Sequence, residues 1–284
     1  MTKAKATVHG AISLVNAIAT QKGATLGIEL KVDATVETNP GKGISIQSEN
    51  KSLSSRLINS TIEKIVSKKY RDENKIEVTL ESEIPTGYGL KSSSAISSAV
   101  ALACSKIFKP KLSDRQILLA GVEASIESKV SITGAYDDAC SCYYGGFNVT
   151  DNFKKNRIKA EKASTNLIAV VFIPKNRKRG NVKNLKILSA VFDNAWELAK
   201  KGDYWNAMNI NGLATAAILN SDPKIIVNLL ENGAHAASVS GNGPSIAAIT
   251  KKENESNIRK VFSTLEGNVI VSKINNKKAE VHEL

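Results

Sequence analysis

The sequence predicts an α+β fold, because strand and helix patterns are mixed along its 284 residues without regular β-α-β alternation. Apolar residues alternate with polar ones at 24–38 and 75–80, which indicates half-buried strands. A continuous apolar run at 167–173, ended by Pro174, indicates a buried strand. A second structural unit begins near residue 150, so we expect domains at 1–150 and 151–284, each with its own core.

The first unit opens with small apolar residues at 4–18, followed by the strand at 24–38 and a turn at Asn39-Pro40-Gly41. An apolar stripe predicts a helix at 52–69, and the Ala/Ser-rich segment 92–108 predicts a helix that packs closely on a sheet. A capping box formed by Ser113 and Gln116 opens another helix, which runs to about residue 128. Residues 131–146 are rich in turn formers.

The second unit is predicted to mix both kinds of element after the strand at 167–173. Helices are expected at 184–201, 204–220, 223–231 and 254–265, and strands at 236–239, 245–249 and 268–274.

The composition excludes several classes of protein. The three cysteines, Cys104, Cys140 and Cys142, match neither a disulfide framework nor a zinc site. We expect no signal peptide and no membrane span, and hence a cytoplasmic protein. The net charge of +12 is spread along the chain and is compatible with a solvated surface, a phosphorylated substrate or nucleic acid.

The segment that carries chemistry is a glycine-rich loop at residues 85–95. It consists of Pro85, Thr86, Gly87, Tyr88, Gly89, Leu90, Lys91, Ser92, Ser93, Ser94 and Ala95. It follows a strand and opens a helix, so its backbone N–H groups and serine hydroxyls would surround one anion. It is neither a Walker loop nor a Rossmann fingerprint, because the required glycine spacing is absent.

This loop resembles the ATP-phosphate loop of the GHMP kinases, which include galactokinase, homoserine kinase and mevalonate kinase. The resemblance implies a two-domain α+β fold with the active site in the interdomain cleft. It also implies ATP and Mg²⁺ as cofactors.

Two further segments fit this resemblance. Residues 133–139, followed by Gly145-Gly146, resemble the segment that holds the family's catalytic aspartate. Measured back from the glycine pair, Asp138 matches that aspartate best, and Asp137 is the alternative. Gly241 and Gly243 lie in a segment that resembles the family's glycine-rich loop supporting the phosphate site.

The resemblance also suggests a metal site. Glu127 lies eleven residues before Asp138, where some relatives have a metal-binding glutamate, so Ser94 and Glu127 form the expected Mg²⁺ pair. Glu123 lies one helical turn earlier and is the alternative. Some relatives place a lysine near the chain start, and Lys3 and Lys5 are the residues nearest to that position.

The stretches at 9–19, 23–30 and 133–139 resemble one branch of the superfamily, the archaeal shikimate kinases. This implies phosphorylation of the shikimate 3-hydroxyl on the route to aromatic amino acids. A substrate carboxylate calls for cationic partners, for which Arg177 and Arg179 are candidates, and Asn16 could bond a hydroxyl.

Two alternatives stay open at this stage. One is another acceptor within the superfamily, homoserine or mevalonate. The other is a basic RNA-binding protein. The low aromatic content of 5% argues against it, because few side chains are available for bases to stack on. We expect no membrane and no nucleic-acid partner, and a monomer or homodimer.

Overall fold

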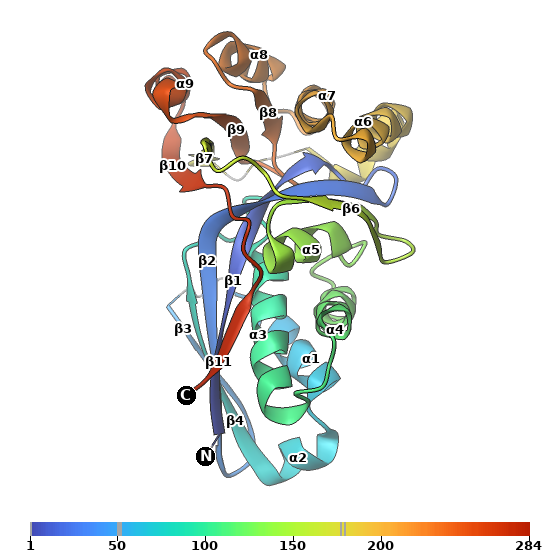
Figure 1. The fold of residues 1–284 in the computed structure, drawn as a ribbon, viewed down its shortest axis with the longest axis vertical. Helices are drawn as coiled ribbons and strands as arrows, with labels where there is room; N and C mark the ends of the chain where they lie inside the picture. Colours follow the sequence, from blue (N-terminus) through green and yellow to red (C-terminus); the bar gives the residue numbers. More distant parts are fainter. Residues whose placement is uncertain (1, 50–52, 177, 179) are drawn as a thin grey trace.

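The computed structural model describes residues 2–49, 53–176, 178 and 180–284. The chain forms an α+β structure of two units stacked end to end (Figure 1). The lower unit in that view contains a long, curved sheet with helices on one face, and the upper unit contains a smaller sheet covered by helices.

The larger sheet has the strand order β11-β1-β2-β4-β3, and β5 and β6 extend it from β2. All its pairs are antiparallel except β3 with β4, which are parallel. In β4 the alternation read from the sequence is realised, since Ile76, Val78 and Leu80 are buried on one face. Its strands are β1 (Thr2–Val15), β2 (Lys22–Pro40), β3 (Gly43–Ser48), β4 (Asn74–Ser82), β5 (Phe147–Asp151), β6 (Asn156–Glu161) and β11 (Glu280–Glu283).

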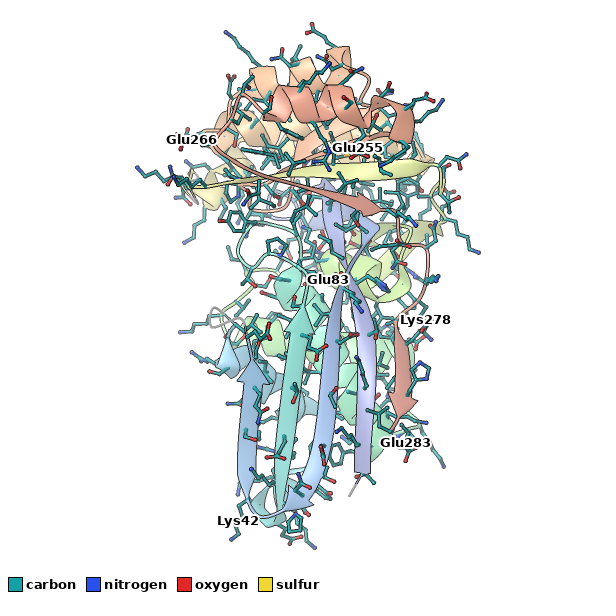
Figure 2. The ribbon with its side chains drawn as sticks, turned by 90° about the vertical axis from the view of Figure 1, so that its left-hand side faces the viewer. Lys42, Glu83, Glu255, Glu266, Lys278 and Glu283 are labelled. Carbon is teal, nitrogen blue, oxygen red and sulfur yellow. The ribbon has the colours of Figure 1, made fainter. Side chains whose placement is uncertain are left out.

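The helices of this unit cover one face of the sheet, and Figure 2 shows the other face lined with polar and charged side chains. The Ala/Ser-rich α3 is buried on nearly all sides, because it lies between the sheet and the outer helices α1 and α4. The helices are α1 (Ser55–Ile65), α2 (Lys68–Glu73), α3 (Ser92–Phe108), α4 (Asp114–Glu127) and α5 (Tyr136–Tyr144).

The smaller sheet has the order β10-β7-β9-β8 and is antiparallel throughout. A second core lies between this sheet and its helices. The elements are β7 (Leu167–Pro174), the 3-10 helices η1 (Val182–Leu188) and η2 (Lys252–Asn254), α6 (Ser189–Lys201), α7 (Tyr204–Ile218), α8 (Pro223–Glu231), β8 (Ala236–Val239), β9 (Ile246–Lys251), α9 (Glu255–Phe262) and β10 (Gly267–Lys273). None of the helices in the described ranges is long and apolar enough to cross a membrane.

Besides the connection from β6 to β7, the β1–β2 turn and the segment after β10 join the units. The turn between β1 and β2 reaches into the second core, where Ile18 and Ala19 pack. After β10 the chain returns to the larger sheet: Asn275 donates from its N–H to the carbonyl of Gly27 at 3.0 Å, and β11 pairs with β1. Residues 156–161 and 280–283, which follow the boundary expected at residue 150, therefore pair within the larger sheet.

Several local expectations also differ from the structure. The turn-rich segment 131–146 contains α5, and the helix expected at 52–69 is two helices, because Ser67 caps a new one. The small apolar residues of 4–18 form most of β1. The three cysteines are buried and unpaired, as expected for structural thiols.

Candidate active site

The loop between β4 and α3 has the backbone shape of an anion site. Gly87 and Gly89 both have φ near +83°, and Lys91 takes a left-handed conformation, φ +67°, at the N-cap of α3. No side chain caps this helix. The N–H groups of its first turn, at Ser92, Ser93 and Ser94, are therefore available to a ligand at the positive end of the helix dipole.

The loop rests directly on the glycine-rich loop of the second unit. Ser240 Oγ donates to the carbonyl of Gly89 at 2.8 Å, and Ser245 Oγ donates to the carbonyl of Tyr88 at 2.6 Å. A Cβ at Gly89 would lie 1.9 Å from the backbone carbonyl oxygen of Ser240, so only glycine permits this close approach of the two loops. Similarly, a Cβ at Gly241 would lie 2.9 Å from Lys91 Nζ.

Lys91 and Asp138 form a nearly buried ion pair at the centre of the site. The nitrogen and Oδ1 are 2.7 Å apart, and the two side chains are 5% and 17% exposed. Lys91 also donates to Ser13 Oγ at 2.7 Å. A carboxylate at the start of α5 is thereby fixed beside the phosphate loop, although the two residues are far apart in sequence.

Asp137 is placed differently from its neighbour. Asn152 Nδ2 donates to its Oδ1 at 2.7 Å, and its own N–H donates to Asn152 Oδ1 at 3.0 Å. Its carboxyl lies against Gly23, where an added Cβ would be 2.3 Å from Oδ2. Burial, and next the charge of Asp138, raise the pKa of Asp137 well above its usual range. Asp137 is thus the enclosed member of the pair, and Asp138 the more accessible one.

These groups line a cavity of about 380 Å³ where the two units meet. Its polar wall is formed by Lys91, by both aspartates and by the serines at positions 13 and 92–94. Its apolar wall comes from the β1–β2 turn, the loop before α5 and η1, through Ala17, Ile18, Val130, Ile132, Ala135 and Val182. Of the loop residues expected to bind cofactor, Gly87, Gly89, Lys91 and the three serines line it, as does Gly241.

The remaining expected cofactor residues act as support. Leu90 and Ala95 are buried in the larger core, and Gly243 has φ +66° in the turn that carries Gly241. Pro85, Thr86 and Tyr88 complete the loop without lining the cavity.

The expected metal pair is not assembled, because Glu127 lies outside the cavity. Its carboxylate pairs with Lys64 and accepts from Ser60 Oγ at 3.0 Å, both on α1. The hydrogen bond from Lys64, and then that from Ser60, lower the pKa of Glu127. Glu123 is also turned away, toward Lys64 at 3.9 Å and Lys155 at 3.8 Å. Ser94 does line the cavity.

The lysines near the chain start lie elsewhere. Lys3 forms an ion pair with Glu37 at 3.3 Å and Lys5 forms one with Asp33 at 3.1 Å. Both pairs connect β1 with β2 in the larger sheet. The lysine that lies beside the aspartate in the structure is instead Lys91. The local sequence pattern places Lys91 in the glycine-rich loop but does not indicate its contact with Asp138.

Among the residues expected to hold the substrate, Asn16 lines the cavity. Much of its amide is already engaged, since Nδ2 donates to the carbonyl of Gly241 at 2.7 Å and Oδ1 accepts from the N–H of Ile18 at 2.9 Å. Asn16 therefore shapes the β1–β2 turn and ties it to the second unit. Arg177 and Arg179 lie outside the described residues.

The assembled groups suit transfer of a phosphoryl group. Backbone N–H groups and hydroxyls can hold phosphate oxygens, and a lysine can neutralise charge. A partly accessible carboxylate can orient or deprotonate an acceptor hydroxyl. Across the described ranges no three His, Cys, Asp or Glu side chains gather as a metal site.

Comparison with known proteins supports this chemistry. The family model for the N-terminal domain of GHMP kinases matches residues 56–146, and the model for the C-terminal domain matches residues 187–265. A shikimate kinase from Methanosarcina acetivorans is 37% identical over 281 residues, covering 96% of this chain and 95% of the relative. A shikimate kinase from Pyrococcus furiosus is 36% identical over 247 residues, covering 84% and 89%.

Solved structures share the fold at lower identity. A homoserine kinase from Cytophaga hutchinsonii superposes with a TM-score of 0.76 at 19% identity, covering 99% of this chain and 97% of the other. The Methanococcus jannaschii mevalonate kinase gives a TM-score of 0.73 at 17% identity, covering 96% and 98%.

Proposed function

We propose that this chain, which belongs to the GHMP kinase family of ATP-dependent small-molecule kinases, phosphorylates the 3-hydroxyl of shikimate. The observation that carries the proposal is the identity of 37% to a shikimate kinase across nearly the whole of both chains. The homoserine and mevalonate kinases share the fold at below 20% identity, so they support the fold and not their own acceptors.

In the proposed reaction the ATP phosphates bind over the start of α3. The N–H groups of its first turn, with the hydroxyls of Ser92–Ser94, hold the phosphate oxygens. The acceptor hydroxyl lies beside Asp138, which takes its proton as the oxygen bonds to the γ-phosphorus and ADP leaves. Lys91 neutralises negative charge between the carboxylate and the transferred group.

A magnesium ion fits the donors present only in part. Mg²⁺ prefers oxygen ligands and is commonly held by few protein groups together with phosphates, so the hydroxyl of Ser94 is a suitable ligand. Glu127 and Glu123 are engaged elsewhere, so most of its ligands would come from ATP and water. When bound, the ion would neutralise charge on the phosphates.

The remaining contacts of the acceptor are proposed from its chemistry. A carboxylate requires cationic or N–H donors. Arg177 and Arg179 remain candidates, because they follow β7 and come shortly before η1, whose Val182 lines the cavity. Asn16 is retained only as a secondary contact, since its amide also fixes the backbone of Gly241 and Ile18.

The test is a panel of acceptors with Mg-ATP and the purified protein. We expect kcat/KM for shikimate to exceed the values for homoserine and mevalonate by orders of magnitude. Product analysis by phosphorus NMR should place the new phosphate on the 3-hydroxyl. Equal or better turnover of homoserine or mevalonate would overturn the proposal. Tight, salt-dependent RNA binding without kinase activity would indicate an RNA-binding protein instead.

A further inference from the structure

Ser13 is a buried hydroxyl at the point where the two units meet. It lies near the end of β1, paired with Thr25 of β2, next to a bulge in the pairing between Ser13 and Val15. It is 1% exposed, yet it belongs to the lining of the cavity. Burial of a hydroxyl destabilises the folded state unless the hydroxyl makes hydrogen bonds.

The hydroxyl oxygen of Ser13 accepts two hydrogen bonds from opposite sides. Lys91 Nζ donates at 2.7 Å from the phosphate loop, and the N–H of Gly241 donates at 3.0 Å from the glycine-rich loop of the second unit. The N–H of Ser13 itself donates to Ser240 Oγ at 3.2 Å. One residue therefore connects the first unit's ion pair to the second unit's loop.

These contacts determine where the lysine ammonium can lie. An ammonium has three N–H donors. Ser13 Oγ accepts one of them, and Asp138 Oδ1 lies 2.7 Å from the nitrogen as an ion pair that lacks hydrogen-bond geometry. The ammonium can therefore still donate to a ligand in the cavity. Without the Ser13 hydroxyl, the ammonium would keep only its ion pair with Asp138. Because it is carried on a flexible four-carbon side chain, it could then turn away from the transferred group.

We propose that Ser13 is a positioning residue for phosphoryl transfer, which acts by holding the Lys91 ammonium between Asp138 and the transferred phosphate. The inference rests on the proposed kinase reaction. Ser13 contributes through Lys91 and not through ATP affinity. Its contact with Gly241 makes the position of the ammonium depend on the second unit being in place.

The first experiment compares Ser13→Ala with Ser13→Thr. Ser13→Ala should lower kcat about tenfold, the value of one hydrogen bond to a charged group, while the KM for ATP stays within about twofold. Ser13→Thr keeps the hydroxyl and should recover most of the turnover. Ser240→Ala is the matched control, because it removes the hydrogen bonds of Ser240 Oγ with Ser13 N–H and the Gly89 carbonyl at the same junction. It should raise the KM for ATP more than it lowers kcat.

The deciding experiment is a double-mutant cycle with Lys91→Met. If Ser13 acts through the ammonium, Ser13→Ala should lower kcat no further in the Lys91→Met protein. A second tenfold loss in that background, or an unchanged kcat for Ser13→Ala alone, would overturn the inference. If Ser13→Ala does not fold, Ser13→Cys, which fills similar space with a weak acceptor, takes its place in the cycle.

The cycle also separates this inference from the proposed function. Wild-type protein that leaves shikimate unphosphorylated refutes the proposed acceptor. If the wild-type protein phosphorylates shikimate and the Ser13→Ala variant does so equally well, only the positioning role is refuted.

Discussion

Exchange of one carboxylate for an amide at Asp138 should separate catalysis from binding. Asp138→Asn removes the group that can accept the proton of the acceptor hydroxyl, a contribution of about 10²–10⁴ in rate. We expect kcat to fall by that factor. The KM for ATP should change little, because the phosphate loop and the N–H groups of α3 are untouched.

The structure also sets the cost in stability. Breaking a buried ion pair costs about 3–5 kcal/mol when one charge is left without a partner. Here the amide oxygen of the variant can take the place of Asp138 Oδ1 beside the ammonium, and Lys91 Nζ still donates to Ser13 Oγ at 2.7 Å. The loss should therefore be nearer to that of one charge-assisted hydrogen bond, about 1.5–3 kcal/mol, measured by urea unfolding.

The matched control is Asp137→Asn. The carboxyl of Asp137 lies between Asn152 and Gly23, and an amide oxygen can replace its acceptor for Asn152 Nδ2. This variant should keep most of its turnover in a coupled assay for ADP release with shikimate. A nearly active Asp138→Asn together with an inactive Asp137→Asn would refute the assignment and move the catalytic role by one residue.

Three further outcomes are expected. Gly89→Ala should raise the KM for ATP at least about tenfold, because its Cβ would lie 1.9 Å from the backbone carbonyl oxygen of Ser240. Gly43→Ala is the control for backbone strain alone, because Gly43 has φ +93° and no atom lies within 4 Å of the added Cβ. Glu127→Gln should leave the Mg²⁺ dependence of kcat unchanged, because its carboxylate faces α1, and a raised Mg²⁺ requirement would contradict this placement. Burial raises the pKa of Asp137, so the folded state holds this proton more tightly than the unfolded chain does. Wild-type stability therefore falls as pH rises from the unfolded pKa of this carboxyl to its folded pKa. Asp137→Asn should therefore gain stability relative to wild type from mildly acidic to neutral pH in calorimetric scans, and a constant difference would show that the carboxyl is not desolvated.

The parts of the site that the sequence predicts are those made by neighbouring residues. Gly87 and Gly89 adopt the positive φ angles that a sharp turn needs, and the serines that follow open α3 as expected. Such features depend on backbone conformation over a few residues, so the local pattern is sufficient to identify them.

The contacts that complete the site join distant segments, and no local pattern encodes them. For this reason the local sequence does not predict the helix α5. Its N-cap, Ala135, has φ +51° and makes no side-chain cap, and the amide of Asn152 bonds the N–H of Asp137 instead. In the same way, Glu127 has the expected spacing from Asp138, but the cation on α1 determines where its carboxylate points.

The glycine pair after α5 locates the aspartates for a reason that the sequence does not reveal. A Cβ at Gly145 would lie 2.9 Å from the carbonyl oxygen of Asn275, and one at Gly146 would lie 2.4 Å from that of Glu161. Gly146 also donates to the carbonyl of Asn275 at 2.7 Å, where the chain returns from the second unit. The end of α5 must therefore be small enough to admit the returning chain. Because the same short helix carries Asp138 at its start, this junction fixes the carboxylate relative to both units, and the spacing to Gly145-Gly146 marks a structural constraint on the site.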